Sequence, residues 1–227
     1  DRVIDSPLAE SGILGTAIGL GLRGYRPVVE IQFDGFVYPA FDQIISQVSR
    51  FHFRSHGHLT MPMVVRIPYG GGIGAIEHHS ESPEAYFAHT PGLKVVTCSN
   101  PVDAYWMIQQ AIASDNPIIF FEPKRRYHEK GEVDVEAEPM PLYQARVVKP
   151  GEDLTLVTYG PMVRTCVEAA IAAGEEGRDI EVIDLRSLAT STEGFSGADA
   201  ALVCEQATES AMEESMASGV MQPITQR

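Results

Sequence analysis

The sequence predicts an α/β protein whose main sheet is parallel. Short apolar runs rich in valine and isoleucine alternate with longer segments whose apolar residues recur at helical spacing. Several of the short runs are continuously apolar, as expected for strands buried on both faces. The 227 residues are 44% hydrophobic and 21% charged, which is typical of a globular chain that buries a sizeable core.

Six short runs are predicted to be strands, and they are distributed over both halves of the chain. They are Val28–Phe33, Pro62–Ile67, Lys94–Cys98, Pro117–Glu122, Leu154–Tyr159 and Ile180–Leu185. Helices are predicted between them, because the intervening apolar residues fall on one face at a period near 3.6. The helical segments are a Gly-rich one including Ala17–Leu22, one over Ala40–Arg54, one around Ala104–Ile112 and one that follows Gly160-Pro161.

The chain changes character twice, and both changes suggest boundaries. His128–Pro141 is acidic and closes with Pro139-Met140-Pro141, which indicates an extended linker. After Ser191 lysine is absent, and Ser196-Gly197-Ala198-Asp199 forms a capping box that predicts a helix over about 198–217. We therefore expect a first α/β domain over 1–138, a linker over 139–152, a second α/β domain beginning at 153 and a helical tail over 189–227.

Charge and cysteine content exclude several classes of protein. Lys and Arg number 17 against 31 Asp and Glu, so the net charge of -14 would repel nucleic acid. The basic cluster Lys124-Arg125-Arg126 is short and is read as a local feature. Cys98, Cys166 and Cys204 are far apart, which argues against a zinc ribbon or a disulfide framework and suits the cytoplasm.

Neither a membrane segment nor several common catalytic motifs can be found in the sequence. No apolar run approaches the roughly 20 residues that span a bilayer, and no signal peptide is visible. The first residue is Asp1, so we expect the chain to begin inside a longer protein. The motifs GxSxG, GxxxxGK[ST] and HExxH are absent, which removes the usual basis for a serine hydrolase, a P-loop NTPase or a zincin.

Two segments in the first forty residues contain candidate functional side chains. In SPLAESGILG, Glu10 precedes a helix of small and apolar residues, where a carboxylate is either catalytic or simply stabilises the helix dipole. In EIQFDGFVYPAFDQ, aromatic residues crowd the turn that follows a strand. Phe33 and Phe41 are expected in the core, although an aromatic ring at the carboxyl end of a parallel strand can also stack on a planar cofactor.

Two further segments lie between Gly70 and Ala88. GGGIGA contains the pattern GxGxxA, but a dinucleotide site would need a helix to open there, and Glu77-His78-His79-Ser80 interrupts it. The adjacent histidines His78 and His79 lack a third ligand at metal-site spacing, so no metal site is predicted in this chain. A histidine beside glycines is either a general acid or base or a structural, hydrogen-bonded residue.

Taken together, these segments resemble one family. The strings DSPLAESGILGTAIG, EIQFDGFVYPAFDQI, HHSESPEAYFAHTPGLKVV, DNPIIFFEPK, LTLVTYG and EVIDLRSL occur in family order up to about residue 188. They are similar to the beta subunits of the thiamine-diphosphate-dependent dehydrogenase component of branched-chain 2-oxoacid and pyruvate dehydrogenase complexes. The resemblance implies a transketolase-like pyrimidine-binding domain, and an enzyme that decarboxylates a 2-oxoacid oxidatively and transfers the acyl group to lipoyl.

The resemblance also assigns roles to individual residues. Glu10 stands where the family's glutamate hydrogen-bonds a ring nitrogen of the cofactor's aminopyrimidine and favours its imino tautomer. Phe36 matches the aromatic residue that packs on the pyrimidine ring, and Gln32 matches a polar residue near that ring in branched-chain relatives. His79 matches the histidine thought to assist acyl transfer to the lipoyl group, whereas His78 is offset by one position.

The family divides its cofactor between two chains, and this implies partners. The alpha subunit holds the diphosphate and its Mg²⁺ through a GDG…N pattern that this sequence lacks. The resemblance therefore implies a two-alpha, two-beta heterotetramer that is active only with the alpha subunit, and a lipoyl acyltransferase component downstream. Relatives also carry monovalent cation sites, so a structural cation is a further expectation; the identity of the 2-oxoacid stays open.

The resemblance ends near residue 188. TEGFSGADAALVCEQATESAMEESM looks like the small helical subdomain of an AAA-type ATPase, in a chain with no Walker A motif. A second domain that stops there would be incomplete, so its strands are expected to have unpaired edges and exposed apolar faces, and the chain to be poorly soluble alone. The alternative to the enzyme subunit is therefore a non-catalytic fragment or fusion that serves as an interaction module.

Overall fold

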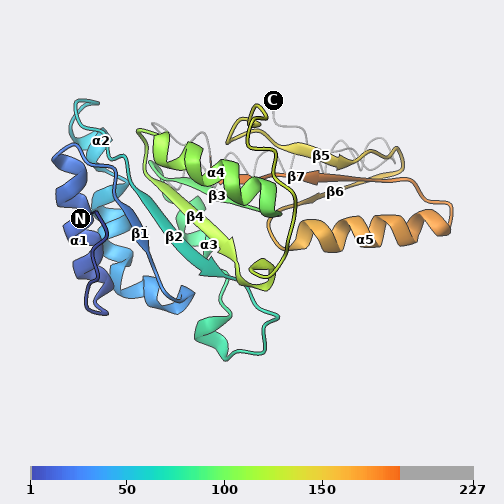
Figure 1. Cartoon of the computed structure of the whole chain (residues 1–227), viewed down its shortest axis with the longest axis horizontal. Helices are drawn as coiled ribbons and strands as arrows, with labels where there is room; N and C mark the ends of the chain where they lie inside the picture. The colour runs from blue at the N-terminus through green and yellow to red at the C-terminus, as the bar shows by residue number, and fades with distance from the viewer. Residues whose placement is uncertain (1, 190–227) are drawn as a thin grey trace, which may run out of the picture.

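Residues 2–189 are described by the computed structural model, and they form two sheets (Figure 1). The strands are β1 (Val28–Glu30), β2 (Val64–Tyr69), β3 (Lys94–Thr97), β4 (Ile118–Pro123), β5 (Arg146–Lys149), β6 (Leu154–Thr158), β7 (Ile180–Asp184) and β8 (Ser187–Ala189). The first sheet has the order β1-β2-β4-β3-β8 and the second the order β5-β7-β6. All neighbours are parallel except β8 beside β3 and β5 beside β7, so the predicted mainly parallel α/β architecture is confirmed.

The six predicted strands are all present, and two further strands join them. β1 stops at Glu30 instead of Phe33 because the chain leaves the sheet for a 3₁₀ helix that starts at Asp34. β5 lies inside the range 139–152 that was expected to be a linker, and no helix or strand occurs between Arg126 and Arg146. β8 has only three residues, and it exists through its pairing with β3.

The helical segments connect these strands. They are α1 (Glu10–Leu22), the 3₁₀ helix η1 (Asp34–Ala40), the π-helix η2 (Gln43–Val48), α2 (Phe51–Arg54), the 3₁₀ turn η3 (Glu77–His79), α3 (Glu84–Ala88), α4 (Pro101–Ala113), the 3₁₀ turn η4 (Lys124–Arg126) and α5 (Met162–Glu175). None of these helices, within residues 2–189, has the length and apolar character needed to cross a membrane.

The one helix predicted over Ala40–Arg54 is helical but not continuous: η1 ends at Ala40, and η2, a π-helix, is followed by the separate α2. Its apolar spacing is nearly helical throughout, yet η2 is a π-helix in which the Ser49 N–H donates to the Ile44 carbonyl at 3.0 Å. A Cβ atom placed on Gly92, which has a φ of +93°, would lie 2.0 Å from the Ser49 carbonyl oxygen. The widened turn and the glycine therefore accommodate a close approach between backbones that the local sequence does not reveal.

The first sheet is covered on both faces, as its continuously apolar strands predict. On one face Val65, Ile67 and Phe121 pack against α1, η1, η2 and α3 in a core whose members are almost completely buried. On the other face Val64 and Val96 pack against α4, which crosses in front of β3 and β4 in Figure 1. Alternate residues of one strand thus enter two cores, so both faces of these strands must be apolar.

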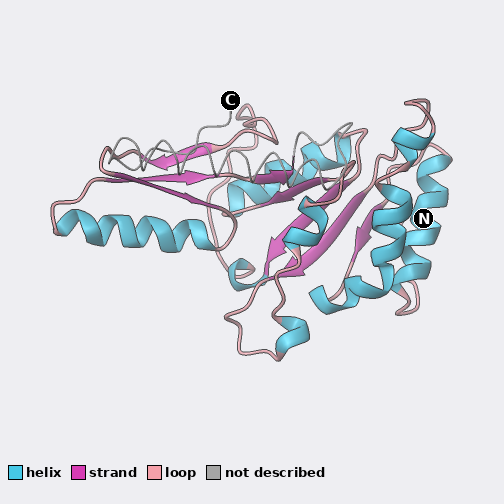
Figure 2. Ribbon diagram, turned by 180° about the vertical axis from the view of Figure 1, so that it is seen from behind, coloured by secondary structure: helices cyan, strands magenta, loops and turns pink. Residues whose placement is uncertain are grey.

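The second sheet is smaller and is covered by α5 on one side (Figure 2). β7 is paired on both of its edges, so the expectation that it would have an unpaired edge is wrong. On β6, however, Leu154 and Val157 are 48% and 60% exposed, in agreement with the expected exposed apolar face. The helix predicted near 198–217 and the AAA-like tail lie outside the described residues.

A buried charged cluster joins the two sheets. The Arg146 guanidinium contacts the Asp103 and Asp184 carboxylates at 2.8 and 3.1 Å, and Ser99 Oγ donates to Asp184 Oδ2 at 2.7 Å. Arg186 is 1% exposed, and its Nη1 donates to the carbonyls of residues 141 and 144 at 2.9 and 3.3 Å. Burial raises the pKa of Asp184, and the neighbouring Arg146 opposes that rise.

Candidate functional site

The candidate site lies at the carboxyl edge of the parallel strands, where several loops meet. β1 leads into η1, β2 leads into a loop over 70–81 that contains η3, and β4 leads into η4. η1 contacts both α1 and η3, so these three segments lie in one region. Because parallel strands all end at one edge of a sheet, segments far apart in the sequence converge there.

Glu10 is the first residue of α1, and its side chain is buried. The residue is 6% exposed, and within residues 2–189 no hydrogen bond or ion pair of its carboxylate is found. The positive end of the helix dipole stabilises an anion at this position, which partly offsets the loss of hydration. The structural reading of Glu10 as a dipole-stabilising residue and the functional reading are therefore compatible in geometry.

Phe36 and His79, two of the sequence-predicted site residues, lie close together with Phe33. The Phe33 and His79 rings are 4.0 Å apart between centroids and inclined by 32°, while Phe36 meets His79 edge-on at 6.1 Å. Phe33 and Phe36 contact each other at right angles, 5.5 Å apart. Phe33 is thus a half-buried partner of His79 and not the core residue that was expected.

A contact with the preceding residue favours the tautomer of His79 that is protonated at Nδ1. His79 Nδ1 lies 3.2 Å from the His78 carbonyl oxygen, so a proton on Nδ1 can be donated to that oxygen. This arrangement leaves Nε2 as the nitrogen with a lone pair. The His78 ring, by contrast, faces the exposed Glu77 carboxylate at 3.5 Å.

A buried ion pair that sequence reasoning missed secures this region. Lys124 Nζ lies 2.8 Å from Asp34 Oδ1 and also donates to the His79 carbonyl, and the Glu81 N–H donates to Asp34 Oδ2 at 2.5 Å. The side chains of Asp34 and Lys124 are 0% and 8% exposed. Lys124 directly follows β4, and Asp34 lies four residues beyond the end of β1 at the start of η1. Their positions after strands, at the carboxyl edge of the sheet, are the available signal, and reading Lys124 as part of a local basic cluster overlooks it.

The remaining predicted residues do not join this group. Gln32 is exposed beyond the end of β1. The loop that carries GxGxxA leads into the short turn η3 and not into a helix, so the condition set for a dinucleotide site is not met. Gly35 lies against η3, and a Cβ atom at this position would come 2.6 Å from the His78 carbonyl oxygen.

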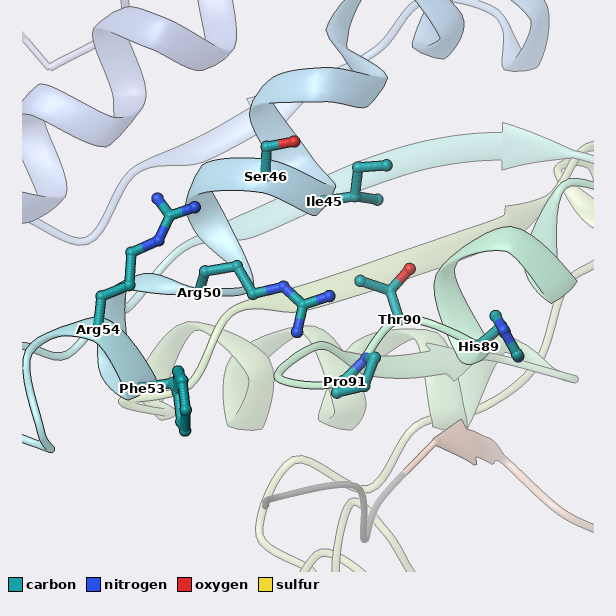
Figure 3. Close-up of a pocket in the computed structure, with 8 residues that line it drawn as sticks. All are labelled: Ile45, Ser46, Arg50, Phe53, Arg54, His89, Thr90 and Pro91. Atoms are coloured by element: carbon teal, nitrogen blue, oxygen red, sulfur yellow. The ribbon is translucent and has the colours of Figure 1, made fainter. Parts of the chain in front are cut away.

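A separate pocket of about 540 Å³ lies beside η2 and α2 and contains none of the predicted site residues (Figure 3). It is lined by Ile45, Ser46, Arg50, Phe53, Arg54, His89, Thr90 and Pro91. In Figure 3 the Arg50 side chain extends toward Thr90 and Pro91. Arg54 donates to Gln47 Oε1 at 2.9 Å, and Thr90 Oγ1 donates to the Tyr86 carbonyl at 2.8 Å, so part of the lining is already paired.

Comparisons with known proteins extend the geometric evidence. The family described as "Transketolase, pyrimidine binding domain" matches residues 1–130, and "Transketolase, C-terminal domain" matches 143–222, a range that includes most of the tail. The solved "Split gene transketolase, inactive beta4 tetramer" is similar in fold, with a TM-score of 0.64 over 78% of this chain and 54% of that chain at 21% identity.

Curated relatives are closer in sequence. A "Pyruvate dehydrogenase E1 component subunit beta" of Leifsonia xyli subsp. xyli is 62% identical over 188 residues, which cover 83% of this chain and 56% of the relative. A "3-methyl-2-oxobutanoate dehydrogenase subunit beta" of Mycobacterium tuberculosis is 54% identical over 191 residues, 83% of this chain and 55% of the relative. The chain therefore spans about half the length of these relatives. It belongs to the transketolase pyrimidine-binding domain family.

Proposed function

We propose that this chain is the beta subunit of a 2-oxoacid dehydrogenase component that decarboxylates pyruvate or a branched-chain 2-oxoacid oxidatively and transfers the acyl group to lipoyl. Relatives with both substrate names, at 62% and 54% identity, support this class of reaction. The geometric observation that carries the proposal is the contact of His79 with Phe33 and Phe36 at the carboxyl edge of the sheet. An imidazole beside an aromatic surface suits proton transfer next to a planar cofactor.

The residues at this edge fit thiamine diphosphate. The carboxylate of Glu10, a residue that is 6% exposed, has no partner within the described residues, so it is available to accept a hydrogen bond from a cofactor ring. When bound, thiamine diphosphate supplies the nucleophilic carbon that the decarboxylation of a 2-oxoacid requires. Phe36 would pack on its pyrimidine ring, and the exposed Gln32 would contribute a polar contact near it.

Glu10 and His79 would then have different tasks. The Glu10 carboxylate would hold a hydrogen bond to a ring nitrogen and so select the tautomer of the aminopyrimidine; its burial strengthens that interaction. His79 would accept or donate a proton at Nε2 during acyl transfer, because Nδ1 faces the His78 carbonyl. The aromatic rings around His79 would exclude water from this proton transfer.

The proposal includes partners. An alpha subunit would bind the diphosphate and its Mg²⁺, two copies of each chain would form the heterotetramer, and the lipoyl acyltransferase component would receive the acyl group. A monovalent cation would stabilise the structure of this chain. We place the assembly in the cytoplasm, whose reducing conditions suit three widely spaced cysteines.

The test uses the full chain mixed with its alpha subunit, thiamine diphosphate and Mg²⁺. Carbon dioxide release is measured with pyruvate and with 3-methyl-2-oxobutanoate, and assembly is followed by light scattering. We expect Glu10→Gln to abolish decarboxylation while assembly is retained, because the amide has no negative charge and cannot take up or release a proton. Glu168→Gln, at a 63% exposed side chain on α5, is the matched control. Unchanged turnover of Glu10→Gln would refute the assignment, and no turnover by any mixture would favour the interaction module.

A further inference from the structure

The Asp34–Lys124 ion pair contacts the loop of His79 from two sides. Lys124 Nζ carries three N–H donors, one directed at Asp34 Oδ1 and one at the His79 carbonyl. The second oxygen of Asp34 accepts the Glu81 N–H, and the Glu81 carbonyl in turn accepts the Gly70 N–H at 2.8 Å. The pair therefore binds the backbone of both His79 and Glu81, on either side of Ser80.

The same pair also lies next to the ring against which His79 packs. Phe33 directly precedes Asp34 in the chain, and Lys124 directly follows β4. Lys124 binds the carbonyl of His79, which carries one ring of the stacked pair. Lys124 also binds Asp34, whose neighbour Phe33 carries the other ring. The two rings, 4.0 Å apart between centroids, are therefore both joined through short stretches of backbone to groups that Lys124 contacts.

The burial of the pair indicates that its bonds are persistent. Side chains of Asp34 and Lys124 are 0% and 8% exposed, so water cannot readily replace either partner. Buried ion pairs gain little net stability compared with apolar residues of similar size, because desolvation offsets their attraction. A buried pair whose hydrogen bonds all lead to one loop is therefore better explained by the geometry it imposes than by the stability it adds.

We propose that Asp34 and Lys124 are positioning residues that hold the His79 imidazole against Phe33 in the orientation needed for acyl transfer. This inference rests on the proposed function of His79. The two residues act through the loop backbone and touch neither the substrate nor the cofactor. Removing the ammonium group releases the His79 carbonyl and the Asp34 carboxylate together, and the ring of His79 then leaves Phe33.

The first readout is the NMR signal of the His79 ring in the full chain, which needs neither cofactor nor partner. The seven histidines are labelled with ¹³C, and His79→Gln identifies the signal. In the wild-type chain the ring current of Phe33 should shift this signal. Lys124→Met, which keeps an unbranched side chain one atom shorter and loses the charged group, should abolish the shift, whereas Lys130→Met, at an exposed lysine, should not. An unchanged His79 signal in Lys124→Met would overturn the proposal.

The second readout is acyl transfer by the complex with the alpha subunit. A misplacement of about 1 Å can lower a rate about 10²-fold, so Lys124→Met should reduce acyl transfer to lipoyl by about that factor with a smaller effect on substrate KM. Lys124→Arg retains charge and donors and should recover part of the rate. If His79→Gln leaves acyl transfer unchanged, the proposed function of His79 fails, and the NMR signal alone decides whether the pair positions the ring.

A double variant separates positioning from stability. Asp34→Asn combined with Lys124→Met leaves no unpaired buried charge, so it should regain most of the Tm that Lys124→Met loses. Because the His79 carbonyl still lacks its donor, the His79 signal and the acyl-transfer rate should stay at the Lys124→Met values. Recovery of the acyl-transfer rate together with the Tm would overturn the proposal.

Discussion

Replacing Arg186 by Met should weaken the junction between the two sheets more than most substitutions in the chain. The guanidinium Nε lies 3.3 Å from Asp103 Oδ1, and Nη1 binds two carbonyls of the connecting segment. Its loss removes the side-chain donor to both carbonyls and leaves Arg146 as the remaining cation beside Asp103. The φ of Arg186 is +58°, so methionine bears the same backbone strain without the bonds that hold it.

The magnitude follows from the burial. Removing one partner of a buried ion pair costs about 3–5 kcal/mol, and the loss of Arg186, which is 1% exposed, falls at the lower end of that range because Arg146 still pairs with Asp103. A domain of ordinary stability has about 5–15 kcal/mol in total, so a large fraction of it is lost. With a urea m-value near the upper end of about 1–3 kcal/mol/M, the unfolding midpoint should fall by about 1–2 M.

The assay is urea unfolding followed by circular dichroism, with a matched arginine elsewhere. Arg164→Met is the control, because Arg164 is 56% exposed on α5 and its ion pair with Glu168 is open to solvent. Its midpoint should stay close to that of the wild type. If Arg186→Met also unfolds at the wild-type urea concentration, the charged junction does not contribute the stability that its burial implies.

Three further predictions concern other parts of the chain. Phe121→Ala should lower the free energy of unfolding by about 3–5 kcal/mol in urea titration, since Phe121 is fully buried between Tyr69 and Phe87; a loss below about 1 kcal/mol would contradict the packing. Burial raises the pKa of Glu84, so stability should fall as the pH rises above about 4, the ordinary carboxyl value, through the higher folded pKa. Glu84→Gln should remove this part of the decline in Tm with rising pH, and an unaltered pH profile would argue against it. Gly35→Ala should displace η3, because the new methyl group would overlap the His78 carbonyl. Acyl transfer by the assembled complex should then fall while Tm changes little. Acyl transfer at the wild-type rate would show that η3 tolerates the displacement.

Local sequence was sufficient wherever burial is continuous. β2 and β4 are apolar on both faces, and this pattern alone predicts central parallel strands. β5 and β8 were missed because each is short and is defined by its partner: Arg146–Lys149 pairs with β7, and Ser187–Ala189 pairs with β3. Nothing within either segment distinguishes it from a loop.

The candidate site was predicted in part, and the missing part is tertiary. Glu10, Phe36 and His79 were chosen from their motifs, and Phe36 and His79 do meet in space. Their supporting contacts could not be read in the same way. Asp34 and Lys124 are separated by 90 positions, and the pairing of an acid and a base over that distance leaves no periodic signal. The break of the helix over 40–54 has a similar origin, because Gly92, whose backbone approaches Ser49 closely, lies in another segment.

The position of β8 has a consequence for the order in which the chain becomes structured during synthesis. Ser187 Oγ donates to the Val95 carbonyl across 92 residues, and β8 forms the border of the first sheet beside β3. Until the ribosome has released the region around residue 189, the outer side of β3 has no strand to bind. A nascent chain that stops near residue 140 would therefore present an open strand to other chains, and the closing of such a long loop is slow. β8 is thus synthesised late and covers the edge of a strand from the first half of the molecule. A fragment that contains only that half should therefore self-associate.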